Sequence, residues 1–488
     1  MNTAKQKTSA LQWIMLALAI LAIVLAKLLP APGGLTDAGF QILGILVAAI
    51  ILFLTWGTGW TSMAIVFAML TLPGVSAAQV TQATFGNNTV VFLLFCFMLA
   101  ACLTESGAAR RIAVWFLTNK LARKSPWWTI AMYFAAVYVL DFFLSASTCI
   151  MILLPILLSM FESVGLVQSE RCKLSSALLL CTVVVAQLAN GANPISHAVT
   201  MQGFSLYESY VGAEMDFFTF CAVSTPITLI TTLLVFLLVR FVWKPDVSPF
   251  KRINYDELAA SCGKFSKREK LSVFFYALCV VFWLLPGLAD YIWPAASGVL
   301  GKINNCFPPL AVLFLMNFIK ADGEPVLAWS DAVKAVNWPT FMFIASIMGL
   351  GSFLGNSSFG ISEWLSNLLS PAFANVSPIA FILVMVLIVN VLTNFCSNSV
   401  ALSVVYAVAL PLCLGVYSGS VNPALLSILI TSSAQNGWAT APASPTAAVA
   451  YASGWGNFRE ILVWGLIIMV LQIAVCMVWG MSAGSILV

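Results

Sequence analysis

Charged side chains are scarce in this sequence: of 488 residues, 22 are Lys or Arg and 18 are Asp or Glu. The charged share is 8%, against about 25% in ordinary soluble domains. Hydrophobic residues make up 61% of the chain, and a soluble fold of this length has no place to bury so much apolar surface. The composition therefore excludes a soluble enzyme, a nucleic-acid-binding protein and a secreted disulfide scaffold, and it indicates a protein embedded in a membrane.

Groups that build metal centres and catalytic sites are scarce as well. The chain has one His, and its 12 Cys are scattered without a CxxC pair or a Cys/His cluster. We therefore predict no zinc site, no redox site and no resident cofactor. Catalysis inside a membrane would require a cluster of bases or nucleophiles, which the sequence does not offer. We expect a transporter and not an enzyme.

Long apolar runs predict an all-α polytopic membrane protein with about 11 transmembrane spans. A spanning helix requires about 20 mostly apolar residues. The first run follows Lys5 and Lys7 and has no convincing small-residue cleavage site after it, so we interpret it as an uncleaved helix. The expected spans are 11–29, 39–56, 60–77, 89–103, 174–190, 215–240, 271–287, 307–320, 338–355, 422–436 and 459–485.

The basic residues predict the orientation, because cytoplasmic loops are enriched in Lys and Arg. With the N-terminus in the cytoplasm, only Lys27 and Lys302 of the 22 basic residues fall outside. This arrangement requires the segments 126–162 and about 374–415 to return to the side from which they enter. We predict a protein of the bacterial inner (plasma) membrane, surrounded by the lipid bilayer, with a cytoplasmic N-terminus and an external C-terminus.

Each returning segment has two apolar arms joined by a polar break, which predicts a re-entrant helical hairpin. Such a hairpin is tolerated at membrane depth only where its tip is buried in protein or lines a wet cavity. The tip Ser145-Ala146-Ser147 aligns with Ser397-Asn398-Ser399 at a separation of 252 positions. Further along, Pro194-Ile195-Ser196 aligns with Pro442-Ala443-Ser444 at a separation of 248 positions, each after an apolar helix that breaks at Asn-Gly.

The two hairpins enter from opposite sides, so the repeat is predicted to be inverted. Inverted repeats with broken helices are typical of secondary transporters, whose site lies near the midplane between the repeats. The predicted divisions are N-terminal spans 1–80, first half 81–243 with broken helix 174–210, cytoplasmic loop 244–270, linking spans 271–335, and second half 336–488 with broken helix 422–453.

Neither hairpin contains a basic side chain, since Lys and Arg are absent between Lys124 and Arg171 and between Lys334 and Arg459. An anionic substrate would have to be held by helix N-termini and by hydroxyl and amide groups. The carbonyls of the unwound segments also suit a coupling cation such as Na⁺. The alternative is that these hydroxyls only bond to helix carbonyls. The candidate substrate-binding residues at the tips are Ser145, Ser147, Thr148, Ser397, Asn398 and Ser399.

Asp141 and His197 are the two unusual side chains near the breaks. Asp141 lies inside the apolar stretch VYVLDFFLSAS, and a carboxylate within the membrane is costly and functional by default. It could bind a cation, carry a coupling proton, or be satisfied by backbone N–H groups of the hairpin turn. His197 follows the first break, where it could donate to a substrate carboxylate or simply complete a helix end.

These motifs, together with the span order, resemble the divalent anion:sodium symporter family over nearly the whole chain. The resemblance implies a carrier of di- or tricarboxylates or of sulfate, coupled to Na⁺, which works as a homodimer with an elevator-like motion. In that family each hairpin tip carries Ser-Asn-Thr and shares oxygen ligands with a Na⁺ site. The implied cation-binding residues here are Asp141, Ser145 and Ser196 in the first half, and Thr393, Asn398 and Ser444 in the second.

The first tip departs from the family pattern. Ala146 stands where the pattern has Asn, and Asp141 stands where it has a Ser ligand. Our hypothesis is therefore a transporter of a small organic anion, coupled to Na⁺ or H⁺, with an altered first site. The alternatives are a dicarboxylate exchanger and a cation/proton antiporter of the same superfamily.

Overall fold

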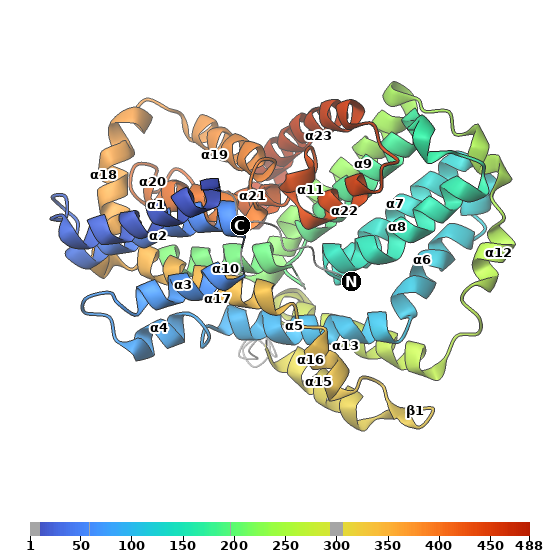
Figure 1. The fold of residues 1–488 in the computed structure, drawn as a ribbon, viewed down its shortest axis with the longest axis horizontal. Coiled ribbons are helices and arrows are strands. Elements are labelled where there is room, and N and C mark those ends of the chain that lie inside the picture. Colours follow the sequence, from blue (N-terminus) through green and yellow to red (C-terminus); the bar gives the residue numbers. More distant parts are fainter. Residues whose placement is uncertain (1–9, 58, 196, 293–305) are drawn as a thin grey trace.

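The computed structural model describes residues 10–57, 59–195, 197–292 and 306–488, and this part of the chain is almost entirely helical (Figure 1). Two short strands, β1 (Lys320–Ala321) and β2 (Glu324–Pro325), pair antiparallel. The helices are α1 (Ala10–Leu28), α2 (Asp37–Trp56), α3 (Trp60–Met69), α4 (Ala77–Ala83), α5 (Asn88–Glu105), α6 (Ala108–Thr118), α7 (Pro126–Phe143), α8 (Ala146–Ser163), α9 (Lys173–Asn190), α10 (Ala198–Val211), α11 (Phe217–Leu238), α12 (Tyr255–Ala260), α13 (Lys267–Ile292), α15 (Phe307–Phe318), α16 (Trp329–Lys334), α17 (Trp338–Gly355), α18 (Ile361–Phe373), α19 (Pro378–Thr393), α20 (Asn398–Leu414), α21 (Pro423–Ala434), α22 (Pro445–Ala452) and α23 (Phe458–Trp479).

Nine helices of the described residues are long and apolar enough to cross a membrane, or up to ten if the bent pair α18 and α19 counts as one span. The sequence predicts about 11 spans. Seven of the predicted spans are among the nine, whereas those at α3, α13, α15 and α21 are not; the other two of the nine are α7 and α8, which the sequence analysis assigns to a re-entrant hairpin. The chain is therefore an integral membrane protein by the length and composition of its helices.

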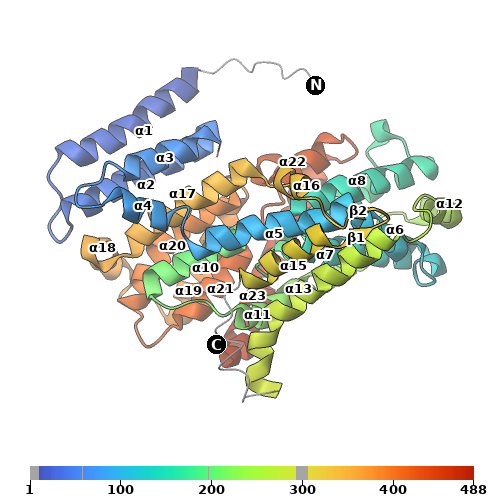
Figure 2. The same ribbon diagram turned by 90° about the horizontal axis from the view of Figure 1, so that it is seen from below.

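The two predicted hairpins are each a pair of packed helices, α7 with α8 and α19 with α20. Both first arms begin in the same way: Ser125 caps α7 and is followed by Pro126, and Ser377 caps α19 and is followed by Pro378. Proline suits the first turn of a helix, where its missing N–H has no partner to lose. Figures 1 and 2 show the two pairs toward opposite ends of the molecule.

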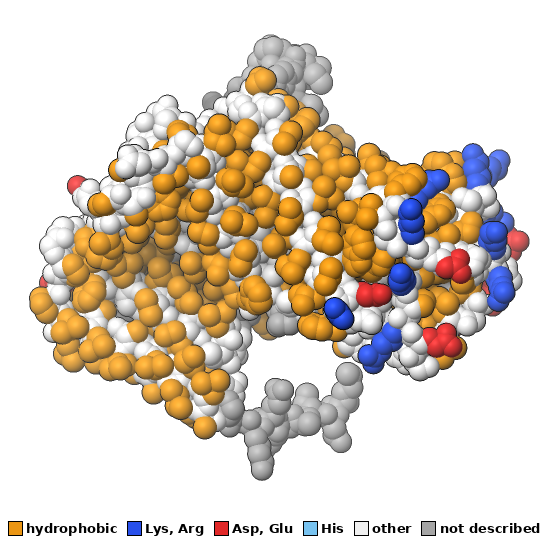
Figure 3. All heavy atoms as spheres, turned by 90° about the horizontal axis from the view of Figure 1, so that it is seen from above, with side chains coloured by type: hydrophobic (Ala, Val, Ile, Leu, Met, Phe, Trp, Pro, Cys, Tyr) orange, Lys and Arg blue, Asp and Glu red, His pale blue; other side chains and the backbone are white. Residues whose placement is uncertain are grey.

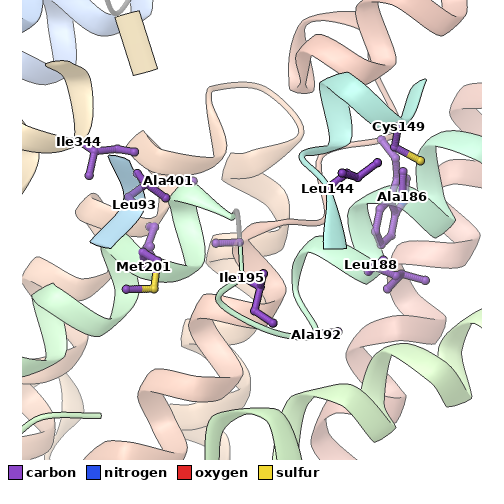
Figure 4. Packing of buried hydrophobic residues seen from close by; sticks show 14 of the residues in the cluster. Leu93, Leu144, Cys149, Ala186, Leu188, Ala192, Ile195, Met201, Ile344 and Ala401 are labelled. Atoms are coloured by element: carbon purple, nitrogen blue, oxygen red, sulfur yellow. The ribbon is translucent and has the colours of Figure 1, made fainter. Parts of the chain in front are cut away.

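Two helices are interrupted next to the hairpin tips. The chain leaves α9 at Asn190 and resumes as α10 at Ala198, and it leaves α21 at Ala434 and resumes as α22 at Pro445. Every residue of α9 after Lys173 is buried. Figure 4 shows Ala192 and Ile195, which connect α9 to α10, between buried side chains of α8 and α9 on one side and of α5, α17 and α20 on the other.

Charged side chains gather at one end of the face seen in Figure 3, whereas most of that face is hydrophobic. At that end Arg111 of α6 binds the segment that leads into α13. Its guanidinium donates to the Glu269 carboxylate at 2.7 Å and to the carbonyls of Cys262, Gly263 and Lys264. The amphipathic helix α6 is thereby joined to the loop 244–270.

Candidate functional site

A cavity of about 330 Å³ lies where the first hairpin tip and both broken helices meet helices α5 and α17. The chain's His lines it, and no Lys, Arg, Asp or Glu of the described residues does. The polar residues of its wall are Thr104, Ser145, Ser147, Thr148, Asn190, His197, Asn337, Thr340 and Gln435, and the apolar ones are Phe97, Ala100, Ala101, Ala146, Met151, Ala198, Val199, Ala335 and Pro445.

The first hairpin tip forms one wall of this cavity. Ser145 is the N-cap of α8, where its hydroxyl accepts from the Thr148 amide and lies 2.9 Å from the Thr148 hydroxyl. Ser147, in the first turn, is exposed to the cavity. The tip therefore offers three hydroxyl groups, of which those of Ser145 and Thr148 lie within hydrogen-bond distance of each other, and the start of a helix.

The first turns of four helices contribute to the cavity wall: α8, α10, α17 and α22. The first N–H groups of a helix have no partner within it, and the helix dipole places partial positive charge at that end. At α10 the cap residue is His197, whose side chain makes no capping bond. Four such helix starts make a positive environment for an anion without any basic side chain, as the sequence predicts for the hairpin regions.

The second hairpin tip does not line this cavity in the described conformation. Instead its polar groups bind the second broken helix. The Thr393 hydroxyl donates to the Ala434 carbonyl at 2.7 Å and lies 2.6 Å from Asn398 Oδ1, while the Asn398 amide lies 3.4 Å from Gln435 Oε1. Ser397, Asn398 and Ser399, which the sequence analysis assigns to the substrate, are therefore not among the residues that line the cavity, and of the three Asn398 contacts Gln435, which does line it.

Hydrogen bonds of the Asn394 side chain connect the second hairpin tip to the second broken helix. Its amide nitrogen donates to the Asn390 and Asn436 carbonyls, and its oxygen accepts from the Trp438 and Ala439 amides. Asn394 is buried in the protein, where an unpaired polar group is costly. The second tip is consequently a closed hydrogen-bonded unit.

Oxygen atoms converge around Gly437 in the second break. A Cβ added to this glycine would lie 2.6 Å from Asn398 Oδ1, 2.9 Å from the Ala443 carbonyl and 3.0 Å from the Thr393 carbonyl. The Ser444 hydroxyl, which caps α22, donates to the Gly437 carbonyl at 2.8 Å. The structure thus places Thr393, Asn398 and Ser444, the three residues of the expected second cation site, next to Gly437, where they pack too closely for an added methyl group.

The corresponding place in the first half is different. Asp141 is 0% exposed, and neither of its carboxylate oxygens has a hydrogen-bond partner among the described residues. His197 is 2% exposed and both ring nitrogens lack a normal hydrogen bond there, although the carbonyls of Asp141 and Phe142 lie near the ring. Asp141 does not line the cavity, and Ser196, the third expected cation ligand with Ser145, lies outside the described residues.

Three glutamines join the two halves near the cavity. Gln187 of α9 donates to the Gly437 carbonyl, and Gln202 of α10 donates to the Ser399 carbonyl and the Ser403 hydroxyl. Gln435 donates to the Thr200 hydroxyl at 3.1 Å. These long-range bonds make the broken helices and the second hairpin one connected polar unit.

The sequence analysis did not assign Thr104, Asn190, Asn337, Thr340 or Gln435 to the site. Asn190 is the first residue of the first Asn-Gly break, and Gln435 directly precedes the second. Side-chain amides at a helix break are therefore the sequence feature that could have identified both residues. Asn337 caps α17 and Thr340 donates its amide to it, a start pattern that can be recognised before the apolar run. Thr104 lies in an ordinary apolar helix, and only the packing brings it to the cavity.

A family model described as the sodium:sulfate symporter transmembrane region matches residues 9–488. The putative malate transporter YflS of Bacillus subtilis is 24% identical over 393 residues, which are 77% of this chain and 76% of that protein. The uncharacterized transporter MJ0672 of Methanocaldococcus jannaschii is 24% identical over 350 residues, 71% of this chain and 72% of that protein.

Two solved transporter structures share the fold. The YdaH transporter of Alcanivorax borkumensis has a TM-score of 0.55 at 12% identity, covering 97% of this chain and 98% of that chain. MtrF of Neisseria gonorrhoeae has a TM-score of 0.55 at 14% identity, covering 98% of this chain and 96% of that chain. At such identities the likeness concerns the fold alone, and it confirms the predicted all-α membrane architecture.

Proposed function

Because the chain belongs to the sodium:sulfate symporter family, we propose that it is a secondary active transporter of a small di- or tricarboxylate-like anion, coupled to Na⁺ or H⁺. The observation that carries the substrate class is the cavity wall, which includes the first turns of four helices and no Lys or Arg of the described residues. Its volume of about 330 Å³ lies at the lower end of the range that small-molecule sites occupy. The relative described as a putative malate transporter supports the same class.

The substrate would be held by hydrogen bonds from neutral groups. Ser145, Ser147 and Thr148 offer hydroxyls, Asn190 and Gln435 offer amides, and His197 offers a ring N–H. Such donors bind carboxylate oxygens through charge-assisted hydrogen bonds, which are roughly twice as strong as neutral ones. Bound cations would supply the remaining positive charge.

The coupling cation would bind beside the hairpin tips. In the second half Thr393, Asn398 and Ser444, whose oxygens lie next to Gly437, would supply ligands to Na⁺. In the first half Asp141 offers a carboxylate that has no hydrogen-bond partner among the described residues, together with Ser145 and Ser196 as the family pattern implies. A cation or proton at Asp141 would offset the cost of burying that carboxylate.

The motion would be of the elevator type, and the protein would be a homodimer, as the family resemblance implies. The hydrogen bonds of Gln187, Gln202 and Gln435 support a moving unit that contains both breaks and the second hairpin. The N-terminus would lie in the cytoplasm and the C-terminus outside. The gathering of charge at the end where α6 and α12 lie supports this orientation.

Uptake by proteoliposomes tests the proposal. Labelled malate, citrate and sulfate are offered while the Na⁺ gradient and the pH gradient are imposed separately. We expect uptake of at least one di- or tricarboxylate to be driven by one of the gradients. Uptake that ignores both gradients and requires internal anion would identify an exchanger instead, and cation flux without any anion dependence would identify an antiporter.

Two variants accompany this measurement. Asp141→Asn removes the buried charge while keeping the shape, and we expect gradient-driven uptake to fall by at least tenfold while anion exchange persists. Asp37→Asn is the matched control, because Asp37 is exposed at the start of α2 and is distant in sequence from both hairpins. Unchanged uptake by Asp141→Asn would contradict a coupling role for Asp141.

A further inference from the structure

Helix α8 has an exposed stripe that runs from the hairpin tip to the other end of the helix. Every fourth residue is exposed, whereas the residues between them are buried or half-buried apart from Glu162 near the end. Residues four apart lie on one face of a helix. Met151, in the middle of a membrane helix, is 73% exposed. The stripe consists of Ser147, Met151, Pro155, Ser159 and Ser163.

The stripe faces two cavities. Its beginning lines the inner cavity described above, and the rest lines a second cavity of about 520 Å³ between α8, Arg110 of α6 and the segment around α12. Met151 lines both cavities and therefore lies at their junction. The second cavity is lined by Arg110, Met151, Ile152, Pro155, Ile156, Ser159, Met160, Ser163, Ile253, Asn254, Glu257, Leu258 and Ser261.

The chemistry of the stripe suits water and not lipid. Three of its five residues are Ser, and Pro155 has no N–H to donate to the Met151 carbonyl, which is left without its helical partner. Helix α19 of the second hairpin has the opposite character, because its exposed residues are Ile379, Leu383, Leu387, Ile388 and Val391. An apolar stripe of that kind faces lipid, whereas the stripe of α8 offers hydroxyls and a carbonyl to a wet passage.

The counterpart of the stripe in the second hairpin is closed. At the separation of 252 positions that aligns the tips, Ser147 corresponds to Ser399 and Met151 to Ser403, both buried in α20. The Ser403 hydroxyl bonds to Gln202 and to the Ser399 carbonyl. The described conformation is therefore open along α8 and closed along α20.

Two charges lie on the wall of the second cavity, Arg110 and Glu257. Glu257 accepts a hydrogen bond from the Asn254 side chain. Arg110 makes no ion pair or hydrogen bond with a described residue, in contrast to its neighbour Arg111, whose guanidinium makes five such bonds. The Arg110 guanidinium is thus available to an anion at the outer end of the passage.

We propose that the second cavity is a vestibule through which the substrate anion moves between the inner cavity and the side of α12, past Met151 and with Arg110 binding it at the outer end. The proposal rests on the function proposed above for the inner cavity. It adds a second contact site for the anion and names the residue at the junction. The side of α12 is the cytoplasm in the predicted orientation.

Thiol labelling tests the passage without requiring transport. Met151→Cys and Ser159→Cys are exposed to the membrane-impermeant reagent 2-sulfonatoethyl methanethiosulfonate in vesicles of either orientation, and each cysteine is read by peptide mass. We expect both to react from the α12 side at least tenfold faster than from the opposite side. Because labelling reports access alone, it can succeed even where none of the tested anions is transported.

Controls come from the same chain. Leu387→Cys on the apolar stripe of α19 and Ser403→Cys on the closed face of α20 should stay unlabelled, and the native Cys149, which is buried two residues from Met151, is an internal reference. Labelling of Leu387→Cys as fast as Met151→Cys, or an unreactive Ser159→Cys, would overturn the vestibule. An anion that binds the inner cavity should slow labelling at position 151 more than at 159.

A second experiment tests the two charged residues of the vestibule. With a transported anion, Arg110→Gln should raise KM about two- to threefold at low salt and Glu257→Gln should lower it, with both differences lost at high salt because exposed charges are then screened. The control is Lys124→Gln, an exposed basic residue that lines neither cavity. Equal effects of Arg110→Gln and Lys124→Gln would exclude a specific role for Arg110.

Discussion

The two hairpins are built alike, but the polar side chains near their tips differ in hydrogen bonding. In the second, the hydroxyl of Thr393 and the amide of Asn394 are fully bonded to the broken helix beside them. In the first, the position of Thr393 is taken by Asp141, which has no partner among the described residues. The polar side chains of the second tip thus bond within the protein, whereas the carboxylate beside the first tip does not bond to any described residue.

The difference extends along the second arm of each hairpin. Helix α8 opens one face toward two cavities, whereas no residue of α20 from Asn398 to Cys413 is exposed. A buried polar group without a partner is retained at a cost only where function requires it. Under the proposed function, the comparison leads us to expect ligand exchange in this conformation at the first half.

The largest expected effect, on cation affinity, comes from adding a methyl group at Gly437. In Gly437→Ala the added methyl group would lie 2.6 Å from Asn398 Oδ1, so that the tip or the break has to move. Overpacking of this kind costs about 1–3 kcal/mol, which corresponds to a loss of about 5- to 150-fold in apparent cation affinity. The measurement is the Na⁺ concentration that half-saturates thermal stabilisation or uptake.

The control for this variant is Gly33→Ala, since nothing lies within 4 Å of an added Cβ at Gly33. We expect the control to keep the affinity of the parent protein. If Gly437→Ala also kept the cation affinity of the parent protein, the oxygens around Gly437 would not be cation ligands. Their hydrogen bonds would then only hold the second half together.

An effect of similar size, opposite in sign for the two halves, is expected on stability. Thr393→Val removes a hydroxyl that bonds to the Ala434 carbonyl, and should lower the unfolding free energy by about 1–3 kcal/mol because a buried acceptor loses its donor. Asp141→Leu removes a buried carboxylate that has no hydrogen-bond partner among the described residues, and should raise the unfolding free energy by a similar amount while uptake is lost. Thermal denaturation in detergent without substrate measures both, and a destabilised Asp141→Leu would show that the carboxylate is bonded in the folded protein.

Local patterns predict the helix pairs and the breaks well. Ser125-Pro126 and Ser377-Pro378 are recognisable helix starts. Asn190-Gly191 marks a break because Asn and Gly have low helix propensity. The family membership follows from the same motifs and is confirmed by the family model. Each of these features depends on residues within a few positions of one another.

What the sequence does not predict depends on contacts between distant segments. The tip residues Asn398 and Ser399 do not face the cavity in this conformation, because Gln435 and Gln202, distant in sequence, engage them. The exposure of Met151 depends on which helices leave α8 uncovered. A repeat predicts that two tips are equivalent, but not which of them is open at a given moment.

The smallest expected effect comes from making the first tip more like the second. Ala146 corresponds to Asn398 and lines the inner cavity. The substitution Ala146→Asn therefore adds one amide oxygen to the first hairpin tip, the hairpin that contains Asp141. One added polar contact contributes about 0.5–1.5 kcal/mol, which predicts a gain of about 3- to 10-fold in Na⁺ affinity. Ala335→Asn, which adds the same group on the opposite wall of the cavity, should give no gain. Equal affinities in both variants and the parent would mean that the missing amide does not weaken the first site, and that its openness arises from Asp141 alone.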